Sequence, residues 1–153
     1  MNTVQDEALR LQGQEVVAGL GEGRLLVLDE PLSFWGGVHA DTGEIIQPDH
    51  PQRGLLLRGQ IMVMARAKGS SSSSSVLAEL VRNGNGPSAI VMREADLIVA
   101  LGSIVASELY AKRLPIVTLS EVDWQRLMKS ERNAVAKIIY NEKQCTVVVD
   151  IEK

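Results

Sequence analysis

Residues 60–80 read QIMVMARAKGSSSSSSVLAEL, and this stretch decides the fold class. Its first part, Gln60–Ala65, is a short apolar run that predicts a buried strand. Its last part, Val76–Leu80, has apolar residues at helical spacing and predicts an amphipathic helix. Gly69 and the serines Ser70–Ser75 connect the two. A strand that leads through a glycine turn into a helix is a building unit of α/β domains.

The serine run has two interpretations from composition and position. A serine tract is typical of a flexible linker, but a linker separates domains, and 153 residues correspond to one domain. Its place between strand and helix instead predicts a helix N-terminus, whose free N–H groups and positive dipole end attract anions. Arg66 and Lys68 add cationic charge just before it. We favour the anion site over an inert serine cap, which is also common.

The rest of the chain predicts a mixed sheet with helices in a single domain, 1–153. Strands are expected as a pair within 14–28 and at 89–92, 115–119, 136–140 and 145–151. An apolar piece is expected at 97–100, a helix at 102–112, and a second helix after Ser120, where Asp123 completes a start similar to a capping box. We also expect a loosely ordered lead-in over 1–13, a long loop rich in Gly and Pro over 29–54, and a C-terminal extension over 120–153.

Composition and charge exclude several classes of partner. The formal net charge is −3, with 16 Lys and Arg against 19 Asp and Glu, so no general attraction to nucleic acid or to an anionic membrane is expected. Aromatic residues make up 3% of the chain, which leaves few platforms for stacking bases. No apolar run approaches the roughly 18 residues of a membrane span, and no signal peptide is visible. We therefore expect a cytoplasmic protein.

The residues that could hold a metal are few. Cys145 is the single cysteine, which excludes an internal disulfide or a cluster of several thiolates from this chain alone. His39 and His50 both lie in the long loop without a neighbouring cysteine, so we expect no metal site of this chain alone. In the same loop Trp35 could cover a ligand pocket or anchor the loop on the core, and anchoring is the more frequent use of a large aromatic side chain.

Five segments occur in the order and spacing of one family: LDEPLSFWGGVHADTGEII (28–46), HPQRG (50–54), KGSSSSSSVLAEL (68–80), NGNGPSAIV (83–91) and LGSIVASELYAKRLPIV (101–117). Together they resemble the small subunit, or swivel domain, of the aconitase X family, over residues 24–119. The resemblance implies a swivelling β/β/α domain similar to aconitase domain 4. It also implies a large aconitase-like partner subunit, whose cysteines hold an iron or iron–sulfur centre.

The resemblance also implies a site. In that family the serine directly after the glycine of the strand–helix turn is the proposed catalytic base, and the matching residue here is Ser70. Lys68, Gly69, Ser71 and Ser72 would bind the substrate, although six identical serines leave the register open by one position. A serine hydroxyl is a weak acid, so its oxyanion would need donors and positive charge already in place.

The implied activity is that of a hydro-lyase acting on a small hydroxy acid. Two substrates occur in the family, cis-3-hydroxy-L-proline and mevalonate 5-phosphate. The residues of the loop and helix motifs, and more weakly the extension over 120–153, favour cis-3-hydroxy-L-proline. An alternative from another class is a stand-alone anion-binding module that regulates a partner.

Overall fold

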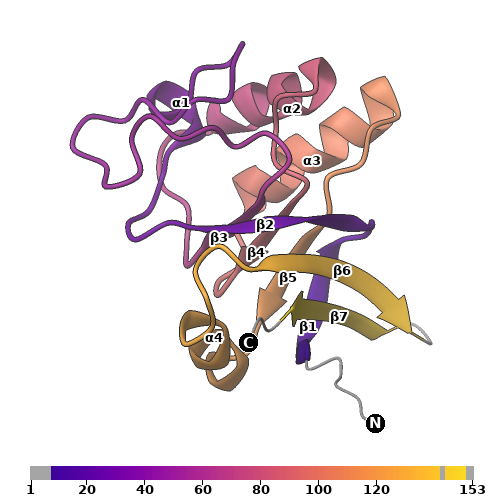
Figure 1. Ribbon diagram of the computed structural model, residues 1–153. Coiled ribbons are helices and arrows are strands. Elements are labelled where there is room, and N and C mark those ends of the chain that lie inside the picture. Colours follow the sequence, from indigo (N-terminus) through magenta and orange to yellow (C-terminus); the bar gives the residue numbers. More distant parts are fainter. Residues whose placement is uncertain (1–7, 142–143, 151–153) are drawn as a thin grey trace, which may run out of the picture.

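Seven strands close into one barrel in a computed structural model that describes residues 8–141 and 144–150 (Figure 1). Around the barrel their order is β1-β5-β4-β3-β2-β6-β7. The strands are β1 (Ala8–Val17), β2 (Gly21–Val27), β3 (Ile61–Met64), β4 (Ala89–Met92), β5 (Ile116–Leu119), β6 (Val135–Asn141) and β7 (Gln144–Asp150). The helices are α1 (Phe34–Gly37), α2 (Ser73–Asn83), α3 (Leu97–Tyr110) and α4 (Glu121–Met128). The predicted mixed sheet with helices is confirmed.

The barrel has a parallel half and an antiparallel half. Strands β2, β3, β4 and β5 run parallel in that order, and the other pairs are antiparallel. Helix α2 connects β3 to β4 and α3 connects β4 to β5, and both helices cover the outer face of the parallel strands (Figure 1). Each of these helices follows a parallel strand in the chain, so the N-termini of α2 and α3 lie at the carboxyl ends of the strands.

Strand β3 shows why its sequence is apolar throughout. Ile61 and Val63 point into the barrel core, whereas Met62 and Met64 point outward into a second core beneath α2 and α3. All four side chains are fully buried. A parallel strand buried on both faces has no polar face, so its run of apolar residues does not alternate.

Two predictions for the N-terminal end are wrong. Residues 8–13 are not a loose lead-in but the first part of β1, because they pair with β7, and Gly13 also pairs with β5; residues 1–7 lie outside the described residues. The strands expected within 14–28 exist but do not pair with each other. Strand β2 pairs instead with β3 and β6, so β6 and β7 separate β1 from β2 around the barrel.

The apolar piece expected at 97–100 and the helix expected at 102–112 are not separate elements. Leu97–Tyr110 form one continuous helix, with Gly102 in its interior. A Cβ atom on Gly102 would lie 2.8 Å from the carbonyl oxygen of Ser74 and 3.1 Å from Cβ of Leu77, both on α2. The glycine therefore permits the close approach of two helices, and a pattern read along one chain cannot reveal this.

The C-terminal segment is part of the barrel rather than an extension. Helix α4 begins at Ser120, whose side chain accepts a hydrogen bond from the Asp123 N–H as the capping pattern predicts. Its Trp124 and Leu127 belong to the core inside the barrel, and β6 and β7 complete the closed sheet. Ile151, the last residue of the strand predicted over 145–151, lies outside the described residues. Among the described residues no helix has the length and apolar character needed to span a membrane.

Candidate functional site

A pocket of about 170 Å³ lies where the N-termini of α2 and α3 meet. Its lining includes Lys68, Gly69 and Ser70 from the β3–α2 loop, Ser73 from α2, Asp96 just before α3, and Phe34 from α1. Ligands of open parallel sheets bind in this position, beyond the carboxyl ends of the strands. The pocket therefore contains the glycine and the first serine of the motif that decides the fold.

The N-terminus of α2 presents the Ser70 hydroxyl and a free N–H donor to this pocket. Ser70 Oγ accepts a hydrogen bond of 3.1 Å from the Ser72 N–H, and Ser73 N donates to the Ser70 carbonyl at 3.0 Å. The N-cap residue, Ser72, makes no side-chain capping bond. Among the described residues the N–H groups of Ser70 and Ser71 have no acceptor. The positive end of the α2 dipole is therefore open to an anion.

The N-terminus of α3 is occupied by its own cap. Asp96 Oδ1 accepts hydrogen bonds from the N–H groups of Ile98 and Val99, each at 2.9 Å. A carboxylate at the N-cap satisfies two helix donors and neutralises the dipole end. Of the two helix N-termini at the pocket, the one at α2 is therefore the better anion site.

Position 69 requires glycine for two reasons, its backbone conformation and the lack of space for a side chain. Its φ of +109° lies in the region that favours glycine. A Cβ atom there would overlap the side-chain oxygen of Ser33 and lie 2.8 Å from Cβ of Ser33. The loop before Ser70 thus runs directly against the segment that precedes α1.

Ser73 is the buried member of the serine run and holds α1 in place. Its Oγ accepts a hydrogen bond of 3.0 Å from the Trp35 N–H, while Ser33 Oγ donates to the Trp35 carbonyl at 2.8 Å. Phe34 is fully buried, but the Trp35 side chain is 58% exposed. The expectation that Trp35 anchors the loop is therefore wrong, because Phe34 fills the core position and turns its neighbour outward.

The HPQRG segment braces the long loop through hydrogen bonds of His50 and Gln52. His50 is buried; its Nδ1 accepts from the Gln52 N–H at 3.0 Å, so Nε2 carries the proton that it donates to the Glu30 carbonyl at 3.1 Å. The Gln52 side chain and the Asp29 backbone and carboxylate exchange two hydrogen bonds, of 2.7 and 3.1 Å. The Gln52 bond, followed by the Arg132 guanidinium, lowers the pKa of Asp29 against an opposing effect of burial. Both ring nitrogens of His50 are thus engaged in the fold.

The comparisons with known proteins agree with this geometry. The model of the aconitase X swivel domain matches residues 10–147. The chain belongs to this family. A chain of the crystal structure of Thermococcus kodakaraensis aconitase X, holo form, superposes with a TM-score of 0.77 at 31% identity, covering 94% of this chain and 99% of that chain. The swivel domain fold is thereby confirmed, and with 94% of the chain covered, residues 120–153 cannot be a mere addition to it.

Two further relatives carry different names. A cis-3-hydroxy-L-proline dehydratase of Pseudomonas aeruginosa is 46% identical over 106 residues, which cover 69% of this chain and 18% of that protein. A phosphomevalonate dehydratase small subunit of Pyrococcus furiosus is 41% identical over 110 residues, 72% of this chain and 78% of that protein. This swivel domain therefore spans about a fifth of the length of the first relative and most of the second.

The residues of this swivel domain do not fit an iron or iron–sulfur centre. Within 8–141 and 144–150 no three His, Cys, Asp or Glu side chains gather in a way that could hold a metal ion. Cys145 is buried in the barrel, and burial raises the pKa of its thiol. A thiolate ligand is therefore disfavoured at this position.

The structure brings together three of the five predicted site residues of the swivel domain. Lys68, Gly69 and Ser70 line one pocket, whereas Ser71 and Ser72 do not line it. The N–H of Ser72 reaches Ser70 Oγ rather than open space. Sequence reasoning missed Phe34, Ser73 and Asp96. An Asp directly before the apolar run 97–101 was a readable N-cap signal, but nothing in the serine run distinguishes Ser73 from its neighbours.

Proposed function

We propose that this chain is the small subunit of a two-subunit hydro-lyase, a dehydratase that removes water from a small hydroxy acid, with Ser70 as its base. One observation carries the proposal. Ser70 Oγ lies in the pocket at the open N-terminus of α2 and accepts the Ser72 N–H at 3.1 Å. A donor already aimed at Oγ stabilises negative charge there more than on the neutral hydroxyl.

The reaction consists of taking a proton from the carbon next to a carboxylate while a hydroxyl leaves the neighbouring carbon and a double bond forms. Ser70 takes the proton as an oxyanion, held by the Ser72 N–H and the α2 dipole. The substrate carboxylate binds the free N–H group of Ser70, and Lys68 adds positive charge. The groups that assist the departing hydroxyl belong to the large subunit in this proposal.

The partner in this proposal is an aconitase-like large subunit that carries an iron or iron–sulfur centre. It is supported by the relatives named small subunits and by the much longer hydroxyproline relative. Exposed apolar side chains, Trp35 and Leu97, also flank the pocket residues Phe34 and Ile98. A stable interface between the subunits should bury at least about 1,000 Å². Co-elution of the co-expressed chains at micromolar concentration supports this pairing, and separate elution contradicts it.

We favour cis-3-hydroxy-L-proline as the substrate. It is supported by the hydroxyproline relative at 46% identity, although the phosphomevalonate relative follows at 41%. The C-terminal segment no longer supports the choice, because it belongs to the shared barrel. Water loss from cis-3-hydroxy-L-proline by the complex, with little from mevalonate 5-phosphate, supports this substrate. Turnover of the phosphorylated compound alone reverses it.

The alternative function is a stand-alone anion-binding regulatory module. It is favoured by the open helix N-terminus, which needs no second chain to attract an anion. This alternative expects tight binding of a carboxylate or phosphate ligand by the isolated chain. The hydro-lyase proposal expects weak binding and no turnover until the large subunit is added, so calorimetry with and without that subunit separates the two.

The replacement Ser70→Ala tests the proposal. Loss of a positioned base lowers kcat by about 10²–10⁴-fold, whereas loss of a local cap costs about 1 kcal/mol of stability. Ser75→Ala is the matched control, because Ser75 is exposed on the same helix and lies outside the pocket. If Ser71→Ala is the inactive variant instead, the base is Ser71, one position further along the chain. Full activity of Ser70→Ala and Ser71→Ala places the base on the large subunit and leaves the serines as a cap.

A further inference from the structure

Asp96 places a carboxylate in the same pocket as Ser70. Only Oδ1 serves the helix, by accepting the two α3 N–H groups at 2.9 Å. Among the described residues Oδ2 has no hydrogen-bond partner, and no Lys, Arg or His nitrogen lies within 4.0 Å of the carboxylate. Lys68, which lines the same pocket, likewise forms no ion pair among the described residues.

One cation and one anion therefore lie in a small pocket without neutralising each other. Such a pair complements a ligand that carries both charges. A carboxylate group suits Lys68 and the open α2 N-terminus, and an ammonium group suits the free oxygen of Asp96. A ligand that carries a phosphate in addition to its carboxylate, and no cation, would instead be repelled by Asp96, because a nearby like charge disfavours binding.

We propose that Asp96 binds the ammonium group of a zwitterionic amino acid substrate and thereby selects it over a phosphorylated hydroxy acid. This proposal rests on the proposed function, since it assigns the substrate class of the same pocket. Asp96 acts here as a specificity residue; Ser70 remains the base.

The capping role of Asp96 must be separated from the binding role. The helix needs an acceptor oxygen at the N-cap, and an asparagine supplies one about as well as an aspartate. The free Oδ2 and the charge are not used by the cap. Asp96→Asn therefore removes the charge that the proposal needs while keeping the acceptor that the fold needs, apart from a small effect of the helix dipole.

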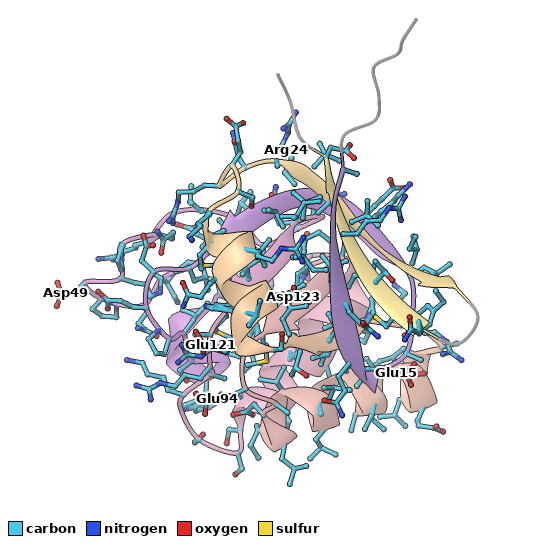
Figure 2. The ribbon with its side chains drawn as sticks, turned by 90° about the horizontal axis from the view of Figure 1, so that it is seen from below. Glu15, Arg24, Asp49, Glu94, Glu121 and Asp123 are labelled. Carbon is cyan, nitrogen blue, oxygen red and sulfur yellow. The ribbon has the colours of Figure 1, made fainter. Side chains whose placement is uncertain are left out.

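Glu94 offers a matched control for charge. It precedes Asp96 by two residues, is exposed, and lies at the surface beside Glu121 (Figure 2). Its carboxylate is 3.8 Å from the Arg93 guanidinium, which also lies 3.6 Å from Glu121. Glu94 does not line the pocket. Glu94→Gln therefore removes one negative charge from the same loop without changing the pocket.

The experiment compares two ligands in the complex with the large subunit. One is cis-3-hydroxy-L-proline; the other is cis-2-hydroxycyclopentane-1-carboxylate, in which a methylene group replaces the ring ammonium. Asp96→Asn should raise KM, or the inhibition constant where no turnover occurs, by about 10–100-fold for the amino acid, the usual range for a hydrogen bond to a charged group. The value for the carbocyclic compound should stay within about twofold, and Glu94→Gln should change neither.

Three results would overturn the proposal. Equal weakening of both ligands by Asp96→Asn, together with a lower Tm, would mean that the residue acts through the fold alone. An unchanged KM for the amino acid would place ammonium recognition elsewhere. Turnover of mevalonate 5-phosphate but not of cis-3-hydroxy-L-proline would exclude the zwitterion, and the response of that activity to Ser70→Ala would still decide the proposed function separately.

Discussion

Replacing Ser73 with alanine should destabilise the chain, although five chemically identical serines surround it. Its Oγ is the acceptor for the Trp35 N–H at 3.0 Å, and the residue is 4% exposed. A buried donor left without its acceptor costs about 1–3 kcal/mol. Because the bond to Trp35 is only partly buried, we expect a loss of about 1–2 kcal/mol, in the lower part of that range.

Ser75→Ala isolates this effect. Serine and alanine differ in helix propensity by a few tenths of a kcal/mol in favour of alanine, and the gain applies to both variants because both residues lie in the first turn of α2. Ser75 is exposed, so its replacement leaves no buried group without a hydrogen-bond partner. The difference between the two variants therefore measures the hydroxyl of Ser73. For a chain of this size it corresponds to a fall in Tm of about 2–8 °C, at about 2–4 °C per kcal/mol.

Urea denaturation followed by circular dichroism gives the free energies, and acrylamide quenching of tryptophan fluorescence reports on α1. Trp35 is exposed and Trp124 is buried, so quenching in the native state reports mainly on Trp35. Ser73→Ala should increase quenching as the turn loosens, and Ser75→Ala should not. Equal stability and equal quenching of the two variants would refute the reasoning that Ser73 holds α1 against α2.

Three further predictions concern single side chains. Tyr140 has a buried hydroxyl without a partner among the described residues, and burial raises its pKa to about 12. The folded chain therefore keeps this proton to a higher pH than the unfolded chain does, so the free energy of unfolding should fall between about pH 10 and 12. Tyr140→Phe should flatten that fall without loss of stability at pH 7. Gly69→Ala should abolish soluble expression or lower Tm, because positive φ alone costs about 1–3 kcal/mol and the new Cβ meets Ser33; an unchanged Tm would contradict this. Asp29→Asn should destabilise the chain at neutral pH. Since the pKa of Asp29 is lowered in the folded state, the difference in free energy of unfolding between variant and wild type should shrink as pH falls through that pKa. If acid denaturation shows a difference that does not depend on pH, the charge is not its cause.

The sequence predicted the parallel half of the fold well because its signals are local. The apolar run at Gln60–Ala65, the helical spacing after the serines and the glycine stop at Gly84 are each visible within a few residues, and Gly84 adopts the left-handed C-cap conformation that the pattern predicts. The Ser120 cap of α4 was readable for the same reason. These elements carry their own start and stop signals.

The errors concern features set by distant parts of the chain. Residues 8–13 have no strong strand pattern of their own, and they become a strand because β7 pairs with all of them and β5 pairs with Gly13. Gly102 looks like a helix start until the approach of α2 is known. Asp96 and Lys68 are 28 positions apart in sequence, so their common pocket follows only from the parallel order of β3 and β4.

The pairing of β1 with β7 has a mechanical consequence. Ala8 lies opposite Asp150, so the first residue of β1 and the last residue of β7 meet at one corner of the barrel. Since Gly13 already pairs with Leu119 at the carboxyl end of β5, this corner lies at the same end of the barrel as the pocket. A polypeptide joined at that corner would keep the pocket within a short tether of whatever it is joined to. The effective concentration of the pocket at a neighbouring domain would then depend on the tether length, and the barrel could rotate as a rigid body without breaking a strand.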